Sequence, residues 1–297
     1  MDKASEYQEV FNKRLVGTLD MAMKYLESHN LKFWIAYGSA IGAVRHNGLI
    51  PWDDDIDIIM FREDYDKLIQ LKDNIKESGL TFVTHDDDGY YFPFGKIYDS
   101  NTTLWELKKY PFIVGVYIDV FPIDRTNLAD KELFEKWQVF RKYQYHYFRS
   151  LQKFSVSDLF SFVRHGRFME FIKACNTILF YRDSKALHKK YSDYEKSLNC
   201  DSGDKYVLFI DEVSEKFIYK AEWFKETQYV DFECLKVPLP NGNHEILKAC
   251  YGDYMTPPPE SERHLSHDFL RYYINLRRAM TLEEIQDRIN KGFRIEY

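Results

Sequence analysis

Four acidic side chains precede an apolar strand in residues 50–60, which read Ile50-Pro51-Trp52-Asp53-Asp54-Asp55-Ile56-Asp57-Ile58-Ile59-Met60. If residues 53–57 are extended, the two-residue period of a strand turns Asp53, Asp55 and Asp57 to one face, with neighbouring carboxylates about 7 Å apart. The apolar run that follows leads into a core, and the sequence has no Lys or Arg from 48 to 60. Because uncompensated buried carboxylates are strongly disfavoured, this pattern predicts a bound divalent cation, Mg²⁺ or Mn²⁺.

Taken alone, such a run is also typical of a solvated acidic turn or a structural Ca²⁺ loop. The residues upstream favour a phosphate site instead. We expect a strand over 31–37 and a helix over 40–45, so that Gly38 and Ser39 lie where the helix begins. Backbone N–H groups and the helix dipole can bind a phosphate there.

Two cations are candidates for binding that phosphate. Arg45 follows the short helix, and Lys96 interrupts an apolar strand expected over 92–98. Each is equally consistent with a structural ion pair.

A further carboxylate is expected from a neighbouring strand over 113–121, where Asp119 is the single acid in an apolar run. The alternative role for Asp119 is a strand-end residue that accepts backbone N–H groups of a turn at Pro122. Asp124, which follows that proline, is expected in the turn itself. His264 and His267 are a weaker candidate metal pair, because they lack a third ligand.

The order of the remaining elements predicts an α/β (α+β) fold, with a central mixed sheet flanked by helices. Helical spacing of apolar residues marks 6–29, 62–78 and 243–251, and strands are expected at 80–85 and 232–240.

A basic segment interrupts this pattern. Residues 130–200 carry 14 Lys or Arg against 8 Asp or Glu, are rich in aromatic residues and are expected to be wholly helical. We therefore divide the chain into a core over 1–130, a helical insertion over 131–200 and a C-terminal part over 201–297 that completes the domain.

The bulk composition narrows the function. A net charge of −6 and a pI near 5.9 give no overall basic field, which argues against nucleic acid as a partner. The four cysteines are far apart in the sequence and form no CxxC pair, which argues against a zinc knuckle or a disulfide framework. No signal-peptide core and no apolar run of about 20 residues is present, so the expected location is the cytoplasm.

Taken together, these residues resemble a known family. The run from Tyr37 to Ile58 is similar to the signature of the LicD family, which includes the fukutin-related proteins. Shorter matches cover most of the chain outside the basic insertion, and they lie at 62–65, 94–97, 117–122, 238–240 and 251–255.

The resemblance implies a nucleotidyltransferase-like fold and an Mg²⁺-dependent phosphotransferase. It implies transfer of phosphocholine, or a related phospho-alcohol, from a CDP-activated donor, with CDP-choline first among the candidates. The implied acceptor is a sugar hydroxyl of a glycan precursor, such as teichoic acid or lipopolysaccharide, and CMP is released. Asp55, Asp57 and Asp119 correspond to the metal-binding acids of the family, with Asp53 close by.

Two other functions stay open at this point: nucleotidyl transfer onto a small molecule or glycan, and a catalytically silent module that binds a nucleotide or glycan. The basic insertion adds a further hypothesis. Lys and Arg interleaved with aromatic residues over 131–200 favour peripheral contact with the inner face of an anionic membrane, where a lipid-linked acceptor would lie. A helical subdomain packed on the core is the alternative.

Overall fold

The central sheet is mixed and has the strand order β1-β2-β6-β4-β3, with β7 paired to the C-terminal part of β6 and β8 paired to β7. The structure is a computed structural model and describes residues 3–180, 183–198, 200, 202–263 and 271–297. The strands of this sheet are β1 (Trp34–Ile35), β2 (Asp57–Phe61), β3 (Leu80–Val83), β4 (Gly95–Asp99), β6 (Tyr117–Thr126), β7 (Lys205–Val207) and β8 (Ile218–Lys220). β2 and β6 are parallel, and the other pairs are antiparallel.

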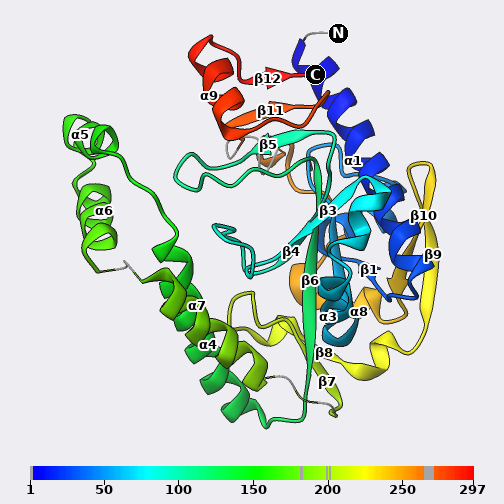
Figure 1. Cartoon of the computed structure of the whole chain (residues 1–297). Coiled ribbons are helices and arrows are strands. Elements are labelled where there is room, and N and C mark those ends of the chain that lie inside the picture. The colour runs from blue at the N-terminus through cyan, green and yellow to red at the C-terminus, as the bar shows by residue number, and fades with distance from the viewer. Residues whose placement is uncertain (1–2, 181–182, 199, 201, 264–270) are drawn as a thin grey trace.

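Two smaller sheets lie beside the central one. The first is the hairpin of β9 (Thr227–Phe232) and β10 (Leu235–Pro240). The second joins β5 (Thr103–Trp105), β11 (Tyr273–Asn275) and β12 (Ile295–Glu296). Figure 1 shows this second sheet and α9 at the same end of the molecule as both termini.

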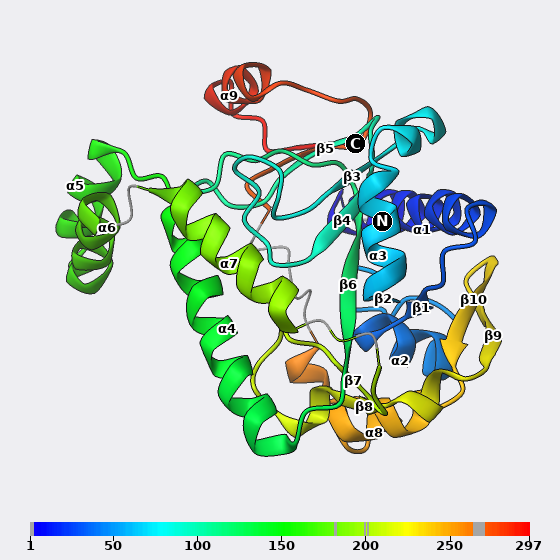
Figure 2. The same cartoon turned by 60° about the horizontal axis from the view of Figure 1, so that its bottom comes forward.

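Helices cover both faces of the central sheet, so the expected α/β fold is confirmed (Figures 1 and 2). The α-helices are α1 (Lys3–Ser28), α2 (Tyr37–His46), α3 (Arg62–Gln70), α4 (Asp130–Ser150), α5 (Val156–Arg164), α6 (Phe168–Phe180), α7 (Ser184–Leu198), α8 (Asn243–Tyr251) and α9 (Leu282–Asn290). Short 3₁₀ helices are η1 (Asn74–Ser78), η2 (Glu215–Phe217), η3 (Ala221–Phe224) and η4 (Glu260–Glu262).

Two apolar clusters form the core on opposite faces of the sheet. Ile58 and Met60 of β2 pack with Leu15 and Leu26 of α1 in the first cluster. Ile59, between them on the same strand, packs in the second cluster with the residues of α4 and α7. This alternation follows from the two-residue period of a strand that is covered on both sides.

Several expected boundaries are wrong. The strand over 31–37 is reduced to β1, because α2 begins at Tyr37 and not at residue 40. The strand expected over 50–60 begins only at Asp57, so residues 53–56 lie outside regular structure. The single strand expected over 232–240 is divided by a hairpin turn at Glu233, which has a φ of 53°, into the end of β9 and β10.

The proline in β6 does not end the strand, contrary to the expected turn. β6 pairs with β4 up to Val120 and with β7 from Asp124 onward, so Pro122 lies where neither strand requires its missing N–H group. Asp124 is therefore a buried strand residue and not a turn residue. Its carboxylate accepts two hydrogen bonds from Arg62, at 2.7 and 2.9 Å.

The segment over 130–198 forms α4 to α7, as its helical pattern predicted. α4 and α7 pack on the core through Trp137 and Tyr191, both fully buried. α5 and α6 instead project from the body of the molecule as a pair (Figures 1 and 2). The domain limits at 130 and 200 remain predictions.

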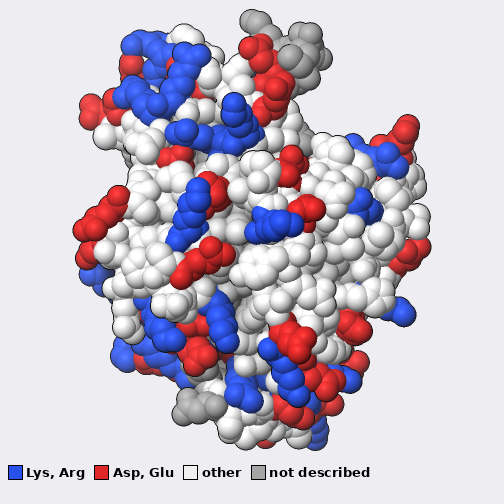
Figure 3. Space-filling view, turned by 90° about the vertical axis from the view of Figure 1, so that its right-hand side faces the viewer, with Lys and Arg blue, Asp and Glu red and all other residues white. Residues whose placement is uncertain are grey.

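Charge is mixed on the face that carries α1 and the β9–β10 hairpin. Figure 3 shows acidic and basic side chains interspersed with uncharged surface there, and Lys and Arg gathered near the end formed by α9. Among the described residues, the structure contains no helix with the length and apolarity required to span a bilayer.

Candidate active site

Three of the acids expected to act together converge at the start of β2 and β6. Asp57 lies directly opposite Asp119 in the parallel register of these strands, and Asp55 precedes β2. One carboxylate oxygen from each of the three lies within 4.8 Å of the other two. Asp57 is 8% exposed and Asp119 is 6% exposed, so these carboxylates are concentrated in a site that is largely shielded from solvent.

The residues around Gly38 hold the acidic segment in position. The Asp57 N–H group donates to the Ser39 hydroxyl at 2.9 Å, and the Asp119 N–H group donates to the Ile56 carbonyl at 2.9 Å. A Cβ atom on Gly38 would lie 2.5 Å from Asp53 Oδ2, so a larger residue there would displace the Asp53 carboxylate.

Gly38 and Ser39 also lie in the first turn of α2, where backbone N–H groups have no partner within the helix. The arrangement therefore keeps the N–H groups available for a phosphate while the Ser39 hydroxyl supports the acids. Binding of phosphate at this turn remains a prediction.

We call Asp55, Asp57 and Asp119 the acid cluster, and Lys96 is the cation that contacts it. It lies opposite Asp119 in the register of β4 and β6, and its ammonium group is 2.7 Å from Asp119 Oδ1. The same ammonium group lies 3.2 Å from the centre of the Tyr117 ring and 3.9 Å from Glu106 Oε1. Lys96 is 1% exposed, so it acts here as the structural ion-pair partner of Asp119, and contact with a phosphate remains a prediction.

Glu106 was missed in the sequence. Its two carboxylate oxygens accept hydrogen bonds from the hydroxyls of Tyr117, at 2.7 Å, and Tyr91, at 2.9 Å. The signal available in the sequence was an acid placed directly after the short segment that forms β5. Through Lys96, Glu106 belongs to the same buried polar network as Asp119.

Asp54 does not face away from its neighbours, contrary to what an extended segment would predict, because residues 53–56 lie outside regular structure. One of its carboxylate oxygens lies within 4.8 Å of one from each of Asp53 and Asp55. Asp54 also has a cation that the sequence did not reveal. Arg271 lies 2.8 Å from Asp54 Oδ2, and its guanidinium also donates to the Asp54 carbonyl at 3.0 Å. It stacks 4.1 Å from the Phe11 ring of α1. Because 217 residues separate the pair, no local pattern could have indicated it.

Arg45 lies at the other end of α2 from Gly38, about 10 Å further along the helix axis at about 1.5 Å per residue. Its guanidinium donates to the Tyr254 carbonyl at 2.6 Å and lies 5.9 Å from the Trp52 ring. A role in phosphate binding remains a prediction for Arg45. His264 and His267 lie outside the described residues.

The donor set fits a hard divalent cation. Burial, reinforced by the charge of Asp55, raises the pKa of Asp53 to about 8 and raises the pKa of Asp57 well above its usual range. Burial raises the pKa of Asp119 to about 7, even though Lys96 opposes the shift. Ionisation of these carboxylates is unfavourable in the metal-free protein, even though Lys96 contacts Asp119. Carboxylate oxygens are the ligands that Mg²⁺ or Mn²⁺ prefers, so a divalent cation suits the site.

These shifts predict how the metal-free protein responds to pH. An acid whose pKa is raised on folding stabilises the fold when protonated, and that contribution is lost as the pH rises from about 4 through the folded pKa. For Asp119 and Asp53 the loss extends to about pH 7 and about pH 8. We expect the melting temperature in EDTA to fall between about pH 6 and pH 8.5.

Excess Mg²⁺ provides the control for this measurement. Mg²⁺ binds the ionised acids, so it should raise the melting temperature more at the higher pH than at the lower one. A melting temperature that is independent of pH in EDTA, or an equal effect of Mg²⁺ at both pH values, would contradict the proposed coupling.

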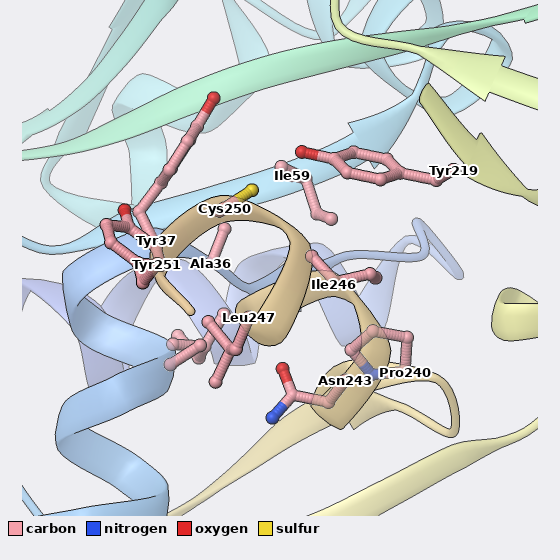
Figure 4. Close-up of a pocket in the computed structure, with 12 residues that line it drawn as sticks. Ala36, Tyr37, Ile59, Tyr219, Pro240, Asn243, Ile246, Leu247, Cys250 and Tyr251 are labelled. Carbon is pink, nitrogen blue, oxygen red and sulfur yellow. The ribbon is translucent and has the colours of Figure 1, made fainter. Parts of the chain in front are cut away.

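A small apolar cavity lies next to this site, between β1, α2 and α8 (Figure 4). Ala36, Ile59, Ile246 and Leu247 line it, together with Tyr37, whose hydroxyl donates to Asp211 at 3.1 Å. Its volume of about 20 Å³ has room for roughly one water molecule. The cavity is therefore a packing defect beneath the helix start and not a nucleotide pocket.

Residues 30–163 match the family LicD/FKTN/FKRP, nucleotidyltransferase domain. This range includes α2, all the acids of the cluster and Lys96, and it continues through α4 into α5. Residues 30–163 therefore carry a LicD family domain, as the resemblance implied, and this match supports the expected assignment of the chain as a transferase.

Individual relatives extend the similarity. The chain is 27% identical over 269 residues to the lipopolysaccharide cholinephosphotransferase LicD of Haemophilus influenzae, covering 85% of this chain and 92% of that protein. It is 35% identical over 91 residues to the mouse ribitol-5-phosphate transferase FKTN, covering 31% of this chain and 18% of that protein. The match to human ribitol 5-phosphate transferase FKRP is 40% over 47 residues, which is 16% of this chain and 10% of that protein.

Proposed function

We propose that this protein transfers phosphocholine, or a related phospho-alcohol, from a CDP-activated donor to a sugar hydroxyl of a cell-surface glycan precursor. The observation that carries the proposal is the convergence of Asp55, Asp57 and Asp119 at the start of two parallel strands. Similarity to a lipopolysaccharide cholinephosphotransferase over 92% of that protein supports phosphocholine as the first group to test.

The acid cluster is suited to an in-line displacement at phosphorus. Asp55, Asp57 and Asp119 would hold Mg²⁺ or Mn²⁺, with Asp53 beside them. When bound, the ion offsets negative charge on the diphosphate and on the departing CMP.

The chain's own residues would position the donor and manage the proton. Backbone N–H groups of Gly38 and Ser39 bind a donor phosphate, and Lys96 limits repulsion by neutralising Asp119. The sugar oxygen forms a bond to phosphorus as the bond to CMP breaks. Asp119, or the neighbouring Asp53, accepts the hydroxyl proton as the general base.

Release of CMP tests the donor. The full chain is incubated with Mg²⁺, a glycan acceptor and one of CDP-choline, CDP-ribitol or CDP-glycerol, and product mass is measured with CMP. We expect CMP release with one of these donors, dependent on Mg²⁺ and abolished by EDTA, together with a gain of the phospho-alcohol mass on the acceptor.

The product distinguishes the alternatives. A gain of nucleoside monophosphate on the acceptor would identify a nucleotidyltransferase. Binding of a CDP-alcohol without CMP release, under conditions where the acceptor is intact, would identify a silent binding module. Either result contradicts the proposed transfer.

We further propose that the α5–α6 pair contacts an anionic membrane. Val156, Phe160, Phe168 and Phe180 are between 61% and 74% exposed, although apolar side chains of this size are normally covered. Arg164 and Lys173 lie on these two helices, and Arg167 lies between them. Exposed aromatic residues beside basic ones are typical of helices that lie in a membrane interface. α4 and α7, in contrast, pack on the core, as the alternative predicted for the whole segment.

Liposome sedimentation at low salt measures this contact. We expect binding to vesicles with anionic lipid and weak binding to neutral vesicles. The variant F160S/F168S should lose binding, whereas Y229S, which removes an exposed aromatic ring from β9, should retain it. No binding of the unmodified protein to anionic vesicles would reject the membrane contact.

A further inference from the structure

A second group of potential metal ligands lies apart from the acid cluster, where the helical segment meets the end of β3. His85 and Asp86 follow β3, and His188 and Glu195 lie on α7 at helical spacing that places both on one face. One ligand atom from each of His85, Asp86 and His188 lies within 4.8 Å of the other two. Glu195 Oε2 lies 3.3 Å from His85 Nε2.

The polar atoms in this group do not satisfy one another. His85 Nε2 lies near three oxygen atoms, namely Glu195 Oε2 at 3.3 Å, Ser192 Oγ at 3.5 Å and Asp86 Oδ1 at 3.7 Å. One N–H group can donate well to only one of them. His188 Nε2 lies 3.1 Å from Asp86 Oδ1 but is buried without a hydrogen bond of acceptable geometry among the described residues.

No permanent positive charge is aimed at the centre of the group among its described contacts. Arg62 contacts the other oxygen of Glu195, at 3.3 Å, and is committed to Asp124 by two hydrogen bonds. The neutral form of the His85 ring offers a lone pair on one of its nitrogen atoms. Two imidazoles and the Asp86 carboxylate converge here, and the Glu195 carboxylate adjoins His85, so the arrangement suits a bound cation.

We propose that His85, Asp86, His188 and Glu195 form a second cation site, for Zn²⁺ or a similar transition-metal ion. Two nitrogen and two oxygen ligands match the preferences of Zn²⁺, whose ligands in a tetrahedral site lie roughly 3.3 Å apart at Zn–N and Zn–O distances of about 2.0–2.1 Å. The three contacts His188–Asp86, His85–Glu195 and His85–Asp86, at 3.1, 3.3 and 3.7 Å, bracket that separation, and Glu195 joins the group through His85. The Asp86 side chain is 48% exposed, which provides a route from solvent.

The ion would be structural and would take no part in the reaction. It joins the loop after β3 to α7, and so connects the central sheet to the helical segment. Because a bound ion stabilises the state that presents all its ligands, it should raise the melting temperature of the folded chain. This site is independent of the proposed transfer reaction.

The test uses the full chain, without an affinity tag, in excess Mg²⁺ that occupies the acid cluster. Zn²⁺ is added after removal of bound metals, and stoichiometry, affinity and melting temperature are measured. Co²⁺ serves as a spectroscopic probe, because a tetrahedral site gives strong visible absorption. We expect one tightly bound Zn²⁺ per chain, a higher melting temperature and the tetrahedral Co²⁺ spectrum.

Variants locate the ion. H188A and D86N remove ligands that are partly exposed, and each should weaken Zn²⁺ binding by at least the roughly 10- to 100-fold seen when an outer-sphere partner is lost. H165A removes an exposed histidine that follows α5 and should leave Zn²⁺ binding unchanged. D55N should also retain the site.

Two results would overturn the proposal. One is equal Zn²⁺ affinity in the unmodified chain, H188A and D86N. The other is loss of Zn²⁺ uptake in D55N, which would assign the ion to the acid cluster.

Discussion

D55N is expected to fold normally and to lose turnover by at least roughly 10²- to 10³-fold, the range seen when one electrostatic group that stabilises a transition state is removed. The substitution keeps the size of the side chain but removes one negative charge from the set formed with Asp57 and Asp119. A weaker ligand set holds the cation less well, so charge on the diphosphate is less well offset.

The melting temperature of metal-free D55N should rise, whereas its turnover falls. Asp55 raises the pKa of both Asp53 and Asp57, which means that its charge opposes theirs in the metal-free protein. D55N should therefore melt at a higher temperature than the unmodified protein in EDTA, near pH 8. CMP release, circular dichroism and melting curves together separate lost chemistry from lost folding.

D73N is the matched control for this variant. Asp73 pairs with Lys76 on the surface, and its side chain is 97% exposed. D73N should therefore retain normal turnover. Activity of D55N within a few-fold of the unmodified protein would reject the assignment of the acid cluster.

R271M is expected to have the largest effect on stability, a loss of about 3–5 kcal/mol in the free energy of unfolding. The substitution removes the guanidinium that lies 2.8 Å from Asp54, while the Asp54 carboxylate remains buried. It also removes the cation stacked on Phe11, so α1 loses one of its contacts with the acidic segment. Urea unfolding measures the difference.

Two further variants separate the buried charge from general loss of packing. K24M breaks an exposed pair with Asp20 on α1 and should cost at most about 1 kcal/mol. The double variant R271M/D54N removes both charges and should recover part of the loss. A cost for R271M no greater than that for K24M would show that the ion pair contributes little to the fold.

The acid cluster could be predicted because its geometry is largely local. Asp53, Asp54, Asp55 and Asp57 are so close in the sequence that their carboxylates must lie near one another, even though strand pairing begins only at Asp57. Asp119 could be added because a single acid in an apolar strand is unfavourable unless a charged or polar partner compensates it. The closeness of Asp57 and Asp119, however, depends on a parallel pairing that no local rule specifies.

Features that depend on long-range contacts were beyond the sequence. Arg271 neutralises Asp54 from the C-terminal part of the chain, and Lys96 faces Asp119 only because β4 pairs with β6. Strand ends were misplaced for a related reason. Pro122 was expected to end a strand, but tertiary pairing leaves a position in β6 where its missing N–H group costs nothing.

The parallel pairing of β2 with β6 also determines when, during folding, the ligands of the acid cluster come together. Asp57 and Asp119 are 62 positions apart, and β3, β4 and β5 lie between them in the chain. Closing so long a loop is entropically costly and brings like charges together at the same moment. Divalent ions should therefore slow unfolding more than they accelerate folding, because their ligands are complete only once β2 and β6 have paired.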